Sequence, residues 1–140
     1  MRDKKHAKSS WISKNQRESV KKPWGHEKSW SGFNGIHGKT LFIRKGCRTS
    51  LKYHKQKSEV LYIRTGKVKF TFGDELSLED PVGHPFKIQV ESEGTTLMVQ
   101  SGCPYRLEAI VDSEIIEIGN NRSDRPVRIE DDHGRCNEKQ

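Results

Sequence analysis

The spacing of polar residues between positions 46 and 66 constrains this chain more than any other feature. The segment reads GCRTSLKYHKQKSEVLYIRTG, with a glycine at each end. Alternate side chains of an extended strand share a face, so Lys52 and His54 are expected to point to the same side. After the polar turn KQKS, an apolar and β-branched segment beginning at Glu59 predicts the returning strand of a hairpin. Glu59 is then expected to meet His54 across the hairpin ladder.

Short strand patterns recur along the chain and are separated by turn residues. Val68, Phe70 and Phe72 alternate with polar residues, which is the period of a half-buried strand. No segment has helical periodicity of useful length, apart from a turn expected near RPVRIEDDHGR. Short strands at this spacing are typical of an antiparallel sandwich or barrel. Strands are predicted at residues 39–45, 50–54, 59–66, 67–73, 86–90, 95–100, 105–111 and 113–119.

The net charge of +7 is concentrated at the N-terminus. Residues 1–28 carry nine Lys or Arg against three acids, a net of +6, which leaves +1 for the remaining residues. The chain is 31% hydrophobic and 32% charged over 140 residues, so we expect one domain and an unfolded extension. The prediction is a disordered basic tail at residues 1–21 and one β domain at residues 22–140. Without an interleaved aromatic pattern or a recognised fold for binding bases, a nucleic-acid partner is not expected.

The sequence contains neither a run of 18 apolar residues nor an apolar signal segment at its start. We therefore expect a cytoplasmic protein without a membrane partner. The three cysteines form no CxxC pair, and reduced thiols agree with that location.

The motif Gly46, Lys52-x-His54, Glu59 and Gly66 resembles the first motif of the cupin superfamily, in which Gly, His-x-His, Glu and Gly recur. The resemblance implies an all-β cupin barrel, a double-stranded β-helix or jelly roll, in agreement with the strand count. Cupins usually hold a divalent metal such as Zn, Mn, Fe or Ni on two histidines, the glutamate and a third histidine.

Two of these four ligand positions are altered here. Lys52 occupies the first histidine position, where an ammonium would repel a cation. Tyr105, within QSGCPYRLEA, stands at the histidine position of the second motif. The resemblance therefore leaves His54 and Glu59 as metal ligands, and the prediction is either a divalent metal on rearranged ligands or no cofactor.

A narrower resemblance covers residues 22–135. KPWG, GCPYRLE and RPVRIEDDHGR, together with the first motif, are similar to the C-terminal cupin domain of bacterial bifunctional mannose-1-phosphate guanylyltransferase/mannose-6-phosphate isomerases (type II). The corresponding segments of that family are typically RPWG, PAGTPHRLEN, VRFEDRYGR and SLQMHHHRAEHW.

This resemblance implies isomerisation between an aldose and a ketose phosphate. Such a reaction needs a base near the carbon and an electrophile on the carbonyl oxygen. The catalytic candidates are His54 as base, Glu59 as orienting carboxylate, and Lys52 as the charge on the oxygen. The substrate-binding candidates are Tyr105 and three arginines that suit a phosphate, namely Arg106, Arg128 and Arg135.

The same residues admit structural explanations. His54 and Glu59 would also make a hydrogen-bonded pair inside a barrel, and Lys52 a buried salt bridge with Glu59 in place of a metal. The alternative function is therefore a metal-free, non-catalytic cupin that binds a sugar or another small anion. A homodimer is expected because an open barrel edge favours pairing with a second copy.

Overall fold

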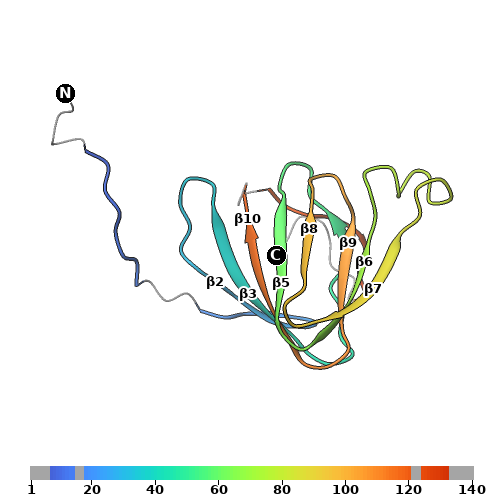
Figure 1. Cartoon of the computed structure of the whole chain (residues 1–140), viewed down its shortest axis with the longest axis horizontal. Helices are drawn as coiled ribbons and strands as arrows, with labels where there is room; N and C mark the ends of the chain where they lie inside the picture. The colour runs from blue at the N-terminus through green and yellow to red at the C-terminus, as the bar shows by residue number, and fades with distance from the viewer. Residues whose placement is uncertain (1–6, 15–17, 121–123, 133–140) are drawn as a thin grey trace.

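The computed structural model describes residues 7–14, 18–120 and 124–132, and within them the chain forms eleven strands and no helix (Figure 1). The strands are β1 (Val20–Lys22), β2 (Gly25–Ser29), β3 (His37–Ile43), β4 (Leu51–Tyr53), β5 (Glu59–Thr65), β6 (Lys67–Phe72), β7 (Lys87–Ser92), β8 (Thr96–Val99), β9 (Tyr105–Ala109), β10 (Ser113–Gly119) and β11 (Val127–Glu130). The expected all-β class is confirmed. None of the described segments is a helix long and apolar enough to cross a bilayer.

The strands form two antiparallel sheets that face each other (Figure 1). The first has the order β1-β2-β3-β10-β5-β8, and the second has the order β11-β4-β9-β6-β7. Alternate side chains of the central strands point between the sheets, so Leu61, Ile63 and Ile115 of the first pack in one core with Phe70 and Leu107 of the second. The architecture is therefore a barrel of two packed sheets, as the alternation predicted.

All eight predicted strands are present, with ends displaced by at most two residues. Three strands were not predicted. β1 and β2 form a hairpin of mostly charged residues around Trp24, which is buried at the end of the core. β11 occupies residues 127–130 of the segment near which a turn was expected, and residues 133–135 of that segment lie outside the described part. β11 pairs with β4, so its strand conformation depends on a partner that local alternation does not reveal.

The predicted hairpin between residues 50 and 66 is also wrong. β4 belongs to the five-stranded sheet and pairs with β9 and β11, whereas β5 belongs to the six-stranded sheet and pairs with β10 and β8. The turn KQKS thus crosses from one sheet to the other. His54 and Glu59 do not share a ladder, but the crossing still brings the His54 Nδ1 to 3.7 Å from Glu59 Oε1.

The first strand, β1, begins at Val20. Residues 7–14 form neither helix nor strand, yet they contact the loop between β2 and β3. The Trp11 ring meets Phe33 edge-on with centroids 5.2 Å apart, and the Ser13 and Ser31 hydroxyls are 2.9 Å apart. Disorder of residues 1–21 stays a prediction, and residues 1–6 and 15–17 lie outside the described part.

Candidate functional site

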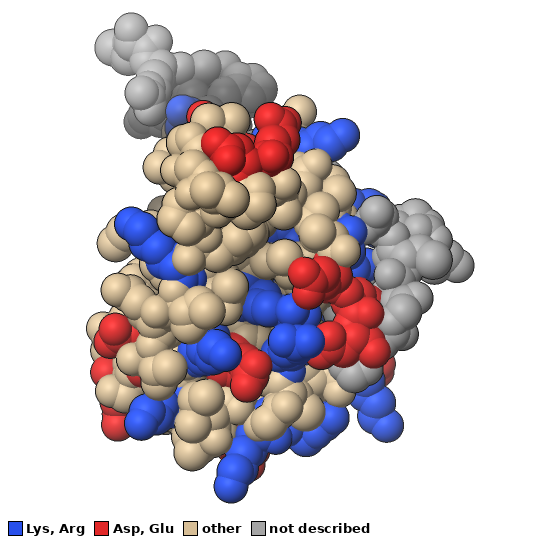
Figure 2. Space-filling model, turned by 90° about the vertical axis from the view of Figure 1, so that its right-hand side faces the viewer, with Lys and Arg blue, Asp and Glu red and all other residues tan. Residues whose placement is uncertain are grey.

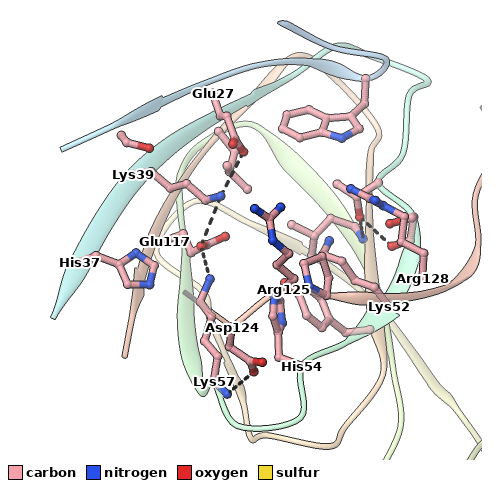
Figure 3. A pocket seen from close by; sticks show the side chains of 18 residues that line it. Glu27, His37, Lys39, Lys52, His54, Lys57, Glu117, Asp124, Arg125 and Arg128 are labelled. Atoms are coloured by element: carbon pink, nitrogen blue, oxygen red, sulfur yellow. Dashed lines mark hydrogen bonds and ion pairs between the residues drawn. The ribbon is translucent and has the colours of Figure 1, made fainter. Parts of the chain in front are cut away.

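A pocket of about 540 Å³ opens between the two sheets (Figure 3). Its size is within the range of small-molecule sites. Side chains from β2, β3 and β10 line one side, and side chains from β4, β9 and β11 line the other. Because the strands alternate, both walls are built from the inward-facing positions next to the apolar core. The charged and imidazole side chains among its lining residues are Glu27, His37, Lys39, Lys52, His54, Lys57, Glu117, Asp124, Arg125 and Arg128.

A chain of alternating charges runs along the six-stranded side, and we call it the ion chain. Its members are Lys22, Glu27, Lys39, Glu117, Lys57 and Glu59. The successive nitrogen-to-oxygen distances are 3.7, 3.2, 3.8, 3.0 and 3.0 Å. Three acids therefore alternate with three bases, and the ion chain neutralises itself. Figure 3 shows its central part from Glu27 to Lys57.

Lys57 lies at the most buried part of the ion chain. Its ammonium is 3.0 Å from an oxygen of Glu59 and 3.0 Å from an oxygen of Glu117. Burial alone would lower the pKa of Lys57, but the two carboxylates outweigh it and raise the pKa. Asp124 fixes the turn around Lys57, because its carboxylate accepts the backbone N–H groups of Gln56 and Lys57 at 2.8 and 2.9 Å. Lys57 is therefore a cation held inside the protein.

Glu59 has partners on both of its oxygens. The Tyr105 hydroxyl donates a hydrogen bond to Oε1, and the Lys57 ammonium pairs with Oε2. Burial and the neighbouring Glu117 carboxylate raise the pKa of Glu59. Burial and Glu59 also raise the pKa of Tyr105 well above its ordinary value, so the phenol stays protonated. Tyr105 thus acts as a hydrogen-bond donor to Glu59.

Lys52 lines the opposite wall and has different surroundings. The expected salt bridge between Lys52 and Glu59 is not formed, because Lys57 takes that place. The Lys52 Nζ instead lies 4.8 Å from the centroid of the Tyr105 ring and has no ion pair with a described carboxylate. Burial, with smaller contributions from Lys39 and Arg128, lowers the pKa of Lys52 to about 8, against the attraction of Glu59.

His54 lines the same pocket, as the spacing with Lys52 predicted. Its side chain is 6% exposed, and its Nδ1 has no hydrogen-bond partner among the described residues. Burial, followed by the charges of Lys57 and Lys52, lowers the pKa of His54 to about 4. The imidazole is therefore neutral near pH 7.

The predicted arginines fall in different places. Arg128 of β11 lines the pocket, and the preceding Arg125 extends its guanidinium across the middle of the view in Figure 3. Arg106 lies on the other face of β9, where it donates to the Thr49 carbonyl at 3.1 Å and pairs with Glu130 at 3.4 Å. The pocket thus receives Arg128 but not Arg106, and Arg135 lies outside the described residues.

Charges on the outer surface are mixed on the side that carries β6 and β7. Figure 2 shows basic and acidic side chains next to one another on that face. The basic wall of the pocket, by contrast, consists of Lys52 and Arg128 with the adjacent Arg125. Asp124 is the acid beside this wall, and it is hydrogen-bonded to the turn.

Sequence reasoning predicted Glu59 but missed the other members of the ion chain, although two of them carried a signal. Lys39 lies two residues from the buried Leu41, and Glu117 lies two residues from the buried Ile115. Residues two apart in a strand share a face, so the strand period places both charged side chains on inward faces. A charged residue at such a position has to be paired. Lys57 carried no such signal, since it lies in a polar turn.

The residues present do not fit a divalent metal. Within residues 7–14, 18–120 and 124–132, no group of three or more His, Cys, Asp or Glu side chains is close enough to hold an ion. Glu59 is already bound by Tyr105 and Lys57, and the Lys57 ammonium would repel a cation at His54 and Glu59. The described candidate residues therefore form a cluster that does not provide a site for a metal ion.

Comparisons with known proteins establish the fold. No family model matches the sequence, and no curated protein matches it. The structure of KdgF from Halomonas sp. matches with a TM-score of 0.65 and 12% identity, over 82% of this chain and 96% of that chain. Oxalate decarboxylase from Bacillus subtilis matches with a TM-score of 0.64 and 16% identity, over 81% of this chain and 31% of that chain. Both are cupin-fold proteins.

This chain has the cupin fold. A second structure of the Bacillus subtilis oxalate decarboxylase gives a TM-score of 0.67 at 14% identity, over 86% of this chain and 34% of the enzyme. The chain thus spans about a third of that enzyme. The expected cupin barrel is confirmed by these structures, and the narrower resemblance to the mannose-6-phosphate isomerase domain stays a prediction.

Proposed function

We propose that this cupin binds a small anionic molecule, such as a sugar phosphate or a related acid, in the pocket between its sheets and without a metal. The excess of cationic side chains on the five-stranded side of the pocket carries the proposal. The three acids of the ion chain are matched by its three bases. The basic wall adds Lys52, Arg125 and Arg128 against Asp124.

The chemistry of the basic wall suits an oxyanion. A guanidinium offers two parallel N–H donors to a phosphate or carboxylate, and an ammonium adds a point charge. Arg128 is only 8% exposed, so a hydrogen bond to it would be poorly screened by water. In a partly enclosed pocket, these cations would therefore attract an anion more strongly than surface cations would.

The metal-free part of the proposal rests on Lys57. Oxalate decarboxylase from Bacillus subtilis has Mn(II) centres. In the chain described here, an ammonium already lies between Glu59 and Glu117, and the two carboxylates are neutralised without an ion. We propose that binding of the anion needs the cations of the basic wall alone.

Titration calorimetry with mannose 6-phosphate, inorganic phosphate and mannose tests this function in the presence of a chelator. We expect both phosphates to bind and mannose to bind much more weakly. Arg128→Met should weaken phosphate binding about 10- to 100-fold, since a hydrogen bond to a charged group is worth about 1.5–3 kcal/mol. Lys67→Met, at an exposed position on β6, is the matched control. Binding that requires a divalent metal, or that is unchanged in Arg128→Met, would contradict the proposal.

A second candidate function is isomerisation of the bound sugar phosphate, and the state of His54 favours it. A neutral imidazole in the pocket is able to take a proton from carbon, and Lys52 on the same wall would place a positive charge near the carbonyl oxygen. Conversion of mannose 6-phosphate to fructose 6-phosphate in the presence of a chelator, lost in His54→Gln, would support it. Binding without any conversion would leave a non-catalytic cupin.

Two further expectations belong to the same proposal. A cytoplasmic location agrees with reduced Cys47 and Cys103, which are both free thiols. A homodimer through an open sheet edge remains a proposal, for which sedimentation equilibrium is the direct measurement. Both agree with a small binding protein acting on a metabolite.

A further inference from the structure

The pocket contains three lysines in unlike surroundings. Lys39 lies 3.2 Å from Glu27 and 3.8 Å from Glu117, and Lys57 lies 3.0 Å from each of its two carboxylates. These ion pairs raise the pKa of both amines, which keeps them protonated. A protonated amine has no lone pair, so neither is a nucleophile.

Lys52 differs from the other two lysines in its contacts. Its Nζ has no ion pair with a described carboxylate and lies over the Tyr105 ring, 4.8 Å from the ring centroid. The side chain is half-buried and lines the pocket. A lysine that is desolvated and next to other cations is the kind of amine that reacts with carbonyl compounds. The amine thus faces the space in which a ligand would lie.

We infer that Lys52 forms an imine with the carbonyl group of an anionic ligand, of which a small 2-oxo acid is the simplest class. This inference rests on the proposed anion-binding function, because Arg128 and Arg125 would hold the acid group while Lys52 meets the carbonyl carbon.

The reaction is balanced without a cofactor. The neutral Lys52 amine attacks the carbonyl carbon, the nitrogen loses a proton, and the carbonyl oxygen gains one to give a carbinolamine. A second proton then lets the hydroxyl leave as water, and the C=N bond forms as a protonated imine. Nothing is oxidised or reduced, and the net reaction consumes one proton and releases one water.

His54 is placed to serve these proton transfers. It follows Lys52 by two residues, lines the same pocket, and has a neutral imidazole. Tyr105 is not available for this role, because its hydroxyl donates a hydrogen bond to Glu59. His54 therefore accepts the proton that the attacking amine releases and returns it to the departing hydroxyl.

Borohydride trapping with pyruvate tests the inference. Reduction of the imine fixes the ligand on the amine, and the peptide that contains Lys52 should gain the mass of pyruvate less one oxygen. Lys52→Arg keeps the positive charge but cannot form the imine, so labelling should fall at least about tenfold. Lys55→Arg, at an exposed position of the adjacent turn, is the matched control and should be labelled like the wild type.

Two ligand controls separate this inference from the proposed function. Acetone has the carbonyl without the acid and should label Lys52 at least about tenfold less than pyruvate. Lactate has the acid without the carbonyl and should bind without labelling. If lactate binds but pyruvate leaves no adduct, or labels exposed lysines equally, the imine is overturned and anion binding stands. If neither acid binds or labels, the proposed function fails together with it.

Discussion

The two walls of the pocket use lysine in opposite ways. On the six-stranded side, Lys39 and Lys57 alternate with carboxylates and neutralise them. On the five-stranded side, Lys52 lies over the Tyr105 ring and has no ion pair with a described carboxylate. A buried charge without a partner is costly, so it persists only where it is useful or tolerated. The contrast is the basis of our proposal that one wall maintains the fold and the other binds a ligand.

The largest effect is expected from breaking the ion chain at its centre. Lys57→Met would leave Glu59 and Glu117 buried without their shared cation and should lower the free energy of unfolding by about 3–5 kcal/mol. Urea denaturation measures the change. Lys55→Met, at an exposed position in the same turn, should change stability by less than about 0.5 kcal/mol.

The double variant Lys57→Met, Glu117→Gln sharpens that test. Removing the Glu117 carboxylate should restore about 1–3 kcal/mol of the lost free energy of unfolding, because Lys57 and Glu117 interact directly. A loss under about 1 kcal/mol in Lys57→Met alone would show that the ion chain does not stabilise the six-stranded side of the pocket.

The basic wall predicts a pH-dependent affinity. The pKa of Lys52 is about 8, so its positive charge is present below that pH and lost above it. Sulfate keeps the same charge over this range, and its affinity should fall about tenfold as pH rises from 7 to 9. Calorimetric titration measures the change, and Lys52→Arg should remove it. An affinity that is flat in the wild type would exclude Lys52 from the anion site.

Removing the Lys52 charge should change the free energy of unfolding in the opposite direction to removing the Lys57 charge. A folded pKa below 10.5 means that the fold disfavours the ammonium of Lys52. Lys52→Met should therefore raise the free energy of unfolding at pH 7, by about 1 kcal/mol. A destabilisation as large as that of Lys57→Met would show that the two walls do not differ in this respect.

A further pH effect concerns His54. Its pKa is 6.5 as a free side chain and about 4 in the fold, so the unfolded chain binds the extra proton between these values. The contribution of neutral His54 to the free energy of unfolding should be fully present above about pH 6.5 and should fall by about 1–2 kcal/mol as pH decreases through 4. Denaturation measured across this range should show a weaker dependence of the free energy of unfolding on pH in His54→Gln. An equally steep profile in the variant would assign the acid sensitivity to other groups.

The sequence predicted strands better than it predicted their partners. Alternation showed which residues of β5 and β6 face the core, because side-chain period is a local property. It could not show that β4 and β5 lie in different sheets, since a polar turn such as KQKS connects a hairpin or crosses between sheets equally well. β11 was missed for the same reason, as its pairing with β4 is made at long range.

The site was predictable to the same degree. Lys52 and His54 were placed on one face by their spacing, and both do line the pocket. Arg106 was expected beside the ligand but lies on the opposite face of its strand from Tyr105, a difference that the strand period alone would have shown. Lys57 could not be found locally, because its role depends on Glu117, which is 60 residues away in the chain.

A crystal structure of the protein with selenate is the most direct test of the difference between the walls. Selenate is a strong anomalous scatterer, so its position is determined independently of the surrounding side chains. The account predicts selenate against the basic wall, near Lys52 and Arg128, with the Lys57 ammonium still between Glu59 and Glu117. Selenate bound at Lys39 or Lys57, or a divalent metal at His54 and Glu59, would contradict it.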